Sequence, residues 1–308
     1  LLCLCVGRYG VAIHCVFFPQ PPHTLTPTSK THAMPTPDIV TRNFFALMRC
    51  AVLHQVQPLE PMSLFKWKRL FAYAANKHVE GIVQNALMAY QRISDAALPP
   101  KAVHTFQIMH GAAIVPNVMQ VPETWLSNWL LNRHLKRIRR IEQRQSQPDL
   151  ATLHALNIIL HSFILLLNQG LSLGALLCLA KYVHTQGPHI NYDKLNQWLS
   201  TLGLNHFAQL LGSMLVLFMG FDKAQLPFVK HINPAAYGMV LKALNVPDPQ
   251  NTPQHIKVWQ SHLGIVHNNS TLLSQSFRHT LAYAHLAPLE AVSNYLHNIK
   301  QNLANLEE

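Results

Sequence analysis

A run of basic residues offers the clearest binding chemistry in this sequence. Six lysines and arginines fall between positions 133 and 144, opposed only by Glu142: Arg133, Lys136, Arg137, Arg139, Arg140 and Arg144. Such side chains bind phosphates through forked hydrogen bonds and by releasing counterions. The run therefore predicts a helix that binds phosphate or another anion. The alternative is a solvated helix face without a ligand, which is the commoner meaning of a charge run.

Two tryptophans precede the basic run. Trp125 and Trp129 are four residues apart, and leucines follow at helical spacing. Their indoles could stack on nucleic-acid bases. Because the spacing matches that of the neighbouring leucines, packing in the protein core is the interpretation that we favour.

Carboxylates and histidines do not form a recognisable catalytic or metal site. The chain has only 13 acidic residues, no D-x-D or D-x-E pair, and one adjacent pair, Glu307 and Glu308. His154 and His161 lie two helical turns apart, too far to share one ion without further ligands. Ser213 lies in an apolar stretch without a G-x-S-x-G motif, so we expect it to pack. We assign no catalytic residue and no metal ligand.

Three stretches, in this order, resemble an uncharacterised nucleotidyltransferase family common in Bacteroidetes. They are residues 43–83, which include Asn43 to Arg49 and Phe65 to Ala74, residues 156–176, and residues 277–290. In the family the second stretch carries an N-x-x-F-x-x-x-H pattern followed by G-I-G-L-R-Q. The third carries F-x-x-Y-x-L-x-P-x-E. The resemblance implies Mg²⁺ and a nucleoside triphosphate as cofactor and substrate.

The same resemblance shows what this chain lacks. The family's catalytic core holds a Gly-Asp-Ile-Asp-Leu motif, whose two carboxylates share one face of a strand and bind the metal ions. No such motif is present, the interval from 98 to 149 is too short for that core, and Gly174-Ala175 replaces the family's Arg-Gln. We therefore expect a divergent or truncated relative that is catalytically inactive. The alternative is a basic helical module that binds nucleic acid, a phosphorylated ligand or a protein partner. A peripheral membrane protein using the basic helix is a weaker option.

Composition supports a helical, polyanion-attracting protein. Of 308 residues, 49% are hydrophobic and 12% charged, and the formal net charge is +11. A large positive charge attracts nucleic acids, nucleotides and acidic lipid surfaces without distinguishing them. Apolar periodicity predicts a mainly α, multi-helix globular bundle, with a short β element possible around 102–121. Five cysteines without a CxxC pair indicate buried free thiols, as in a cytoplasmic protein.

The chain is predicted to have three parts. Residues 1–37 read as a disordered or non-native segment with a proline-rich linker, since the apolar opening has only Arg8 as a basic residue and lacks the charged leader of a signal peptide. Residues 38–148 form an N-terminal helical region and residues 149–308 a C-terminal one. Helices are expected after Asp38, from Glu123 and after Asp149.

The apolar run 158–180 is long enough to span a membrane. It carries Asn168, Gln169 and Gly170 at its middle, which a membrane span should not do. We therefore expect two buried helices joined by a turn there. The stretch 226–252, with four prolines, is expected to be loop-rich.

Overall fold

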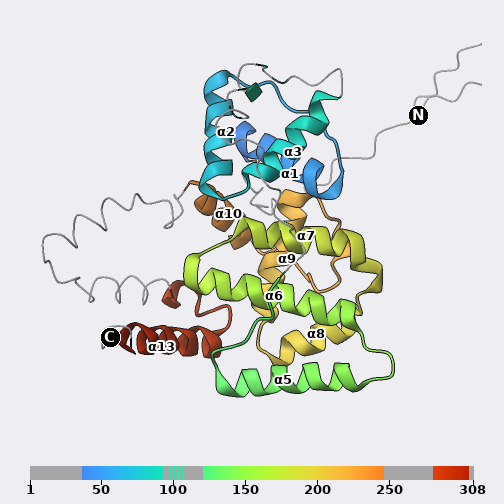
Figure 1. Cartoon of the computed structure of the whole chain (residues 1–308), viewed down its shortest axis with the longest axis vertical. Helices are drawn as coiled ribbons and strands as arrows, with labels where there is room; N and C mark the ends of the chain where they lie inside the picture. The colour runs from blue at the N-terminus through green and yellow to red at the C-terminus, as the bar shows by residue number, and fades with distance from the viewer. Residues whose placement is uncertain are drawn as a thin grey trace, which may run out of the picture. The chain divides into compact units, whose positions relative to one another are not determined.

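The described part of the chain is helical. The computed structural model describes residues 37–92, 98, 100, 103, 104, 106, 121–245 and 280–304, of which 301–304 are described by their backbone alone. No strand occurs among these residues, which confirms the mainly α class (Figure 1). The β element expected around 102–121 falls almost entirely outside the described residues. Positions 103, 104 and 106 within it are helical.

From α5 to α9 the helices follow one another with short connections. In chain order they are α1 (Ile39–Leu53), α2 (Leu64–Asn76), α3 (Glu80–Gln91), α5 (Trp129–Arg144), α6 (Leu150–Gln169), α7 (Leu173–Gln186), α8 (Tyr192–Thr201), α9 (Asn205–Met219), α10 (Ala235–Asn245) and α13 (Pro288–Ala304), with single 3₁₀ turns at Gly187–His189 and Lys223–Gln225.

Local side chains begin and end several of these helices. The Asp38 carboxylate accepts from the Thr41 amide at 2.8 Å, and Asp149 accepts from Thr152 at 2.9 Å. Each thereby satisfies one of the amides that a helix start leaves without a partner. At the other end, α9 stops at Gly220, whose φ of 73° lies in the left-handed region that glycine adopts without strain.

One expectation about the helices was wrong, and another was incomplete. The helix expected from Glu123 begins only at Trp129, and residues 121–128 are extended or bent. The proline-rich stretch 226–252 contains α10 between Ala235 and Asn245, because Pro234 precedes the helix rather than interrupting it. Residues 1–36 of the predicted N-terminal segment lie outside the described residues.

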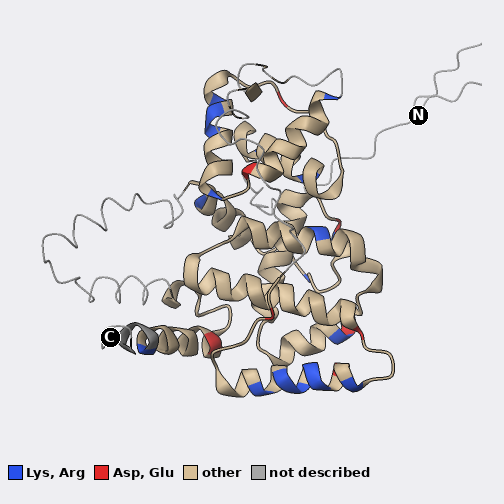
Figure 2. Cartoon of the chain, in the orientation of Figure 1, with Lys and Arg blue, Asp and Glu red and all other residues tan. Residues whose placement is uncertain are grey.

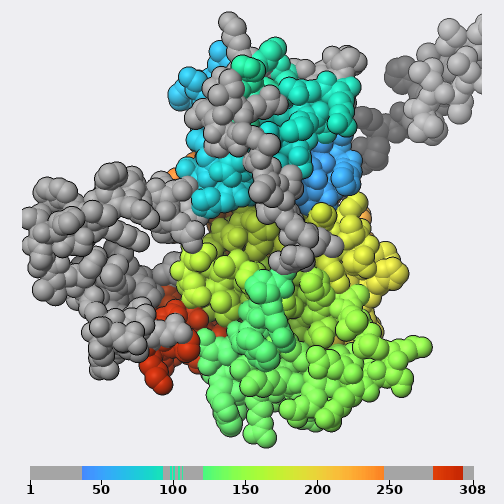
Figure 3. Space-filling model, in the orientation of Figure 1, coloured from blue at the N-terminus to red at the C-terminus, as the bar shows by residue number. Residues whose placement is uncertain are grey.

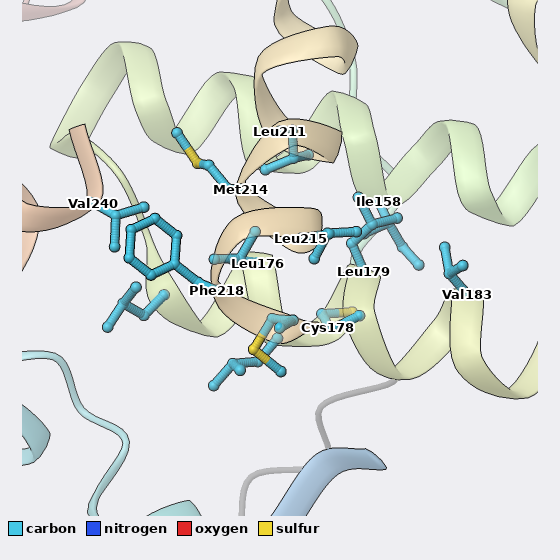
Figure 4. Packing of buried hydrophobic residues seen from close by; sticks show 14 of the residues in the cluster. Ile158, Leu176, Cys178, Leu179, Val183, Leu211, Met214, Leu215, Phe218 and Val240 are labelled. Carbon is cyan, nitrogen blue, oxygen red and sulfur yellow. The ribbon is translucent and has the colours of Figure 1, made fainter. Parts of the chain in front are cut away.

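Helices from both sides of the expected boundary at 148–149 share one core. Helix α1 packs on α3, α7 and α9, and α6 packs on α7 and α8. Figure 4 shows Leu176 and Leu179 of α7 beside Leu215 and Phe218 of α9, all buried. Cys50 and Cys178 are buried free thiols, as expected.

Among the described residues, α6 is the one helix whose length and composition would allow it to cross a membrane. Its residues pack against α7 and α8, and more than half of its most apolar stretch is buried inside the protein. Helix α6 ends at Gln169 and Gly170 follows, which confirms the predicted turn.

Candidate anion-binding face of helix α5

Helix α5 is held against the protein by one apolar side and one buried ion pair. Leu131, Leu135 and Ile138 are buried, and the helix packs on α6 and α8. Glu142 is only 2% exposed and pairs with the ammonium of Lys194 on α8 at 2.7 Å. The only carboxylate of the helix is therefore turned inward and neutralised.

The opposite side of α5 is basic. Arg133, Lys136, Arg137, Arg140 and Arg144 are all exposed. Because they recur at intervals of three and four residues, they lie on one helical face. Figure 2 shows these side chains as a blue series along α5 at the bottom of the view. In Figure 3, which is coloured by residue number, the green part of the chain that contains α5 lies at the surface. Helix α5 thus presents five cations to solvent and no carboxylate.

Arg139 does not belong to this exposed face, although the sequence analysis grouped it with the other five cations. It is 6% exposed, and its Nη2 donates to the carbonyl oxygen of Thr124 at 2.7 Å and to Asn157 Oδ1 at 3.1 Å. The helical position of Arg139 directs it toward residues 123–125 and α6 rather than to solvent. Burial lowers the pKa of Arg139, against the opposing effect of Glu123.

Both tryptophans lie at the surface, so the prediction of core packing was wrong. Trp125 is 47% exposed and Trp129 is 69% exposed. Trp125 precedes the helix and so does not follow its apolar stripe, and Trp129 is the first helical residue. The guanidinium carbon of Arg139 lies 4.5 Å from the Trp125 ring centre, and that of Arg133 lies 5.8 Å from the Trp129 ring centre. These contacts orient both indoles next to cations.

Two distant residues hold the segment 121–128 that leads into α5. The side chain of Asn157 accepts from the Thr124 amide at 3.0 Å and donates to the Pro122 carbonyl oxygen at 3.0 Å. The buried carboxylate of Glu290 on α13 accepts from the amides of Ser127 at 2.6 Å and Asn128 at 2.9 Å. Burial raises the pKa of Glu290 although these two hydrogen bonds lower it.

The sequence alone did not indicate a role in the site for Asn157 or Glu290. Both fall within the family-like stretches, residues 156–176 and 277–290. No spacing rule connects them to residues 122–128, because the contacts join α6 and α13 to a segment remote in the chain. Asn128 adds a local contact, since its side chain caps α5 by accepting from the Leu130 and Leu131 amides.

Ser213 and His161, to which the sequence analysis assigned no catalytic or metal-binding role, are fully and partly buried, respectively. Ser213 is buried, donates to the Gln209 carbonyl oxygen at 2.7 Å and accepts from the Asn233 amide at 2.9 Å, so it packs as expected. His161 lies with its Nδ1 3.4 Å from Thr124 Oγ1, and burial lowers its pKa. Among the described residues no three His, Cys, Asp or Glu side chains gather closely enough to hold a metal ion.

Comparison with protein-family models, with curated proteins and with solved structures gave no match for this chain. The nucleotidyltransferase resemblance therefore stays a prediction.

Proposed function

We propose that this protein is a helical nucleic-acid-binding module that takes a single strand along the basic face of α5. The observation that carries the proposal is the series of five exposed cations with no exposed carboxylate on the same helix, flanked by two exposed indoles. The helix has 16 residues and is therefore about 24 Å long, which is enough for several phosphates. The net charge of +11 adds a general attraction to polyanions.

The indoles favour a single strand over a duplex. Proteins that bind single strands without sequence preference combine a cationic track with aromatic side chains on which bases stack. Trp129 has a largely exposed ring beside Arg133, and Trp125 is oriented by Arg139 and Lys136. In a duplex the bases already stack on one another, so these rings would gain less from it.

A membrane surface suits α5 less well. Amphipathic helices bind membranes by burying their apolar face among the lipids. In α5 that face, formed by Leu131, Leu135 and Ile138, is already buried against the protein. The side left for a partner carries the five cations as well as the exposed Leu130 and Ile141, and its high charge favours phosphates over lipid tails.

The expected salt dependence follows from the number of cations. For single strands the logarithm of the affinity falls by about 0.7 per neutralised phosphate for each tenfold rise in salt, so five contacts give a slope of about −3.5. A fourfold rise in salt should then weaken binding by about 100-fold.

The test is fluorescence anisotropy of a labelled 20-nucleotide single strand with the full chain over a range of salt. The variant Arg133→Glu/Arg137→Glu/Arg140→Glu should lower affinity by at least about tenfold and reduce the salt slope by about 2. The matched control is Lys223→Glu/Lys230→Glu/Lys242→Glu, which makes the same change of charge at exposed positions outside α5.

Equal losses in the two triple variants would show that net charge, not α5, drives binding, and would refute the proposal. Tighter binding to anionic vesicles than to the strand would replace it with the membrane function. The single variant Trp129→Ala should weaken strand binding by about 1–3 kcal/mol while leaving thermal stability unchanged, because the ring is largely exposed.

A divergent, catalytically inactive nucleotidyltransferase relative is our second proposal. It is supported by the three family-like stretches, and two of their residues, Asn157 and Glu290, share the task of holding residues 122–128. Calorimetric titration with Mg-ATP, with and without EDTA, tests it. Metal-dependent binding of ATP would indicate a functional nucleotide site and contradict the inactive relative. Absence of binding would agree with a relative that has lost the family's catalytic activity.

A further inference from the structure

An open cavity lies between α5, α6, α7 and the segment that precedes α5. Its volume is about 640 Å³, within the range of small-molecule sites. Its polar lining residues include Arg139, Asn157 and Gln186. The apolar ones include Val121 and Leu153. Such a mixed lining suits a small molecule with one polar group and an apolar body.

The guanidinium of Arg139 is incompletely satisfied at this cavity. Its Nη2 has the two acceptors described above, but the buried Nη1 has no hydrogen-bond acceptor. The Glu123 Oε1 lies 3.1 Å from Nη1, within ion-pair distance but without the alignment of a hydrogen bond. A buried donor without an acceptor costs free energy, so a better-placed oxygen would stabilise the site.

Glu123 is the movable member of this pair. Its side chain is 59% exposed, whereas that of Arg139 is 8% exposed and packs on Trp125. Glu123 also lines the cavity. A carboxylate that enters the cavity can therefore take the place of the Glu123 carboxylate, while the guanidinium stays where α5 and Thr124 hold it.

We propose that the cavity binds a small organic carboxylate, whose oxygens pair with Arg139 Nη1 in place of Glu123. A guanidinium N–H forms strong, charge-assisted hydrogen bonds with carboxylates, and Glu123 already places a carboxylate beside Nη1. The apolar body of the ligand lies along Val121, Leu150 and Leu153. Because this site faces α6 and α7, the carboxylate proposal does not depend on whether the basic face of α5 binds a nucleic acid.

The experiment uses the full chain with benzoate as the probe and benzamide as its neutral counterpart. Benzoate should bind in calorimetric titration and raise the Tm, and benzamide should do neither. Glu123→Gln removes the competing carboxylate and should tighten benzoate binding by about tenfold or more, since like charges side by side oppose association. The control Glu80→Gln removes a carboxylate on α3, outside the cavity lining, and should leave the affinity unchanged.

Further variants make the result decisive. Ala151→Leu narrows the cavity without removing a hydrogen-bonding side chain and should abolish benzoate binding. Arg139→Lys keeps the positive charge but loses the guanidinium group, and should weaken benzoate binding. If this variant does not fold, the result for Ala151→Leu tests the proposal instead. The proposal is overturned if benzamide binds as well as benzoate, if inorganic phosphate binds as well as benzoate, or if Glu123→Gln leaves the affinity unchanged.

Discussion

Two glycines in helices give a stability prediction in which the same substitution has opposite effects. Gly212 lies within α9 and Gly238 within α10, and neither has a positive φ. Alanine is favoured over glycine inside a helix by about 1 kcal/mol. On propensity alone, Gly212→Ala and Gly238→Ala should therefore stabilise the protein equally.

Packing separates the two sites. A Cβ atom at Gly238 meets nothing within 4 Å, whereas one at Gly212 would lie 2.3 Å from Val229 Cγ2 and 2.8 Å from Phe228 Cε2. Val229 and Phe228 are both buried and so cannot swing into solvent. Overpacking of this kind costs about 1–3 kcal/mol. Gly212→Ala should therefore be less stable than Gly238→Ala by that amount, and should lie between neutral and about 2 kcal/mol below the wild type.

Urea unfolding followed by circular dichroism measures both variants against the wild type. Gly238→Ala should raise the free energy of unfolding by about 1 kcal/mol with an unchanged m-value. If Gly212→Ala is as stable as Gly238→Ala, the close approach of α9 to residues 228–229 is not as tight as the structure shows, and the reasoning fails.

Two further predictions concern ionisable groups that are partly or fully buried. Burial lowers the pKa of His161 below its ordinary 6.5, so below that pH the unfolded state takes up a proton that the folded state resists, and stability is lost as the pH falls through 6.5. The unfolding free energy of His161→Gln should vary less with pH between about 5 and 7 than that of the wild type, and an identical dependence would contradict this. Lys194→Met leaves the Glu142 carboxylate buried without its ammonium and should cost about 3 kcal/mol. Adding Glu142→Gln should recover much of that loss in the same urea assay, and additive losses would argue against a coupled pair.

Much of the fold could be predicted because helix signals are local. Asp38 and Asp149 each accept from an amide three residues ahead, so the sequence alone places these helix starts. The same holds for Gly170 and Gly220, which follow the last residues of α6 and α9. Helix α10 was missed because prolines were read as loop signals, although Pro234 lies just outside the helix, where a proline does no harm.

The basic face was predictable in part for the same reason. Residues three and four apart share a helical face, so Arg133, Arg137, Arg140 and Arg144 had to lie together once α5 was helical. The spacing did not predict which side of α5 faces the protein. Arg139 turned inward because Thr124 and Asn157 offer it acceptors, and both lie outside the helix.

The sequence by itself determined the helical class, the charge and the row of cations, since each depends on residues within a few positions of one another. Only the tertiary structure decided that Trp125 and Trp129 are exposed, that Arg139 faces a cavity, and that Glu290 holds the start of α5. Glu290 and Asn128 are separated by 162 positions along the chain. Contacts over such distances arise from the packing of whole helices, and no local pattern of residues encodes them.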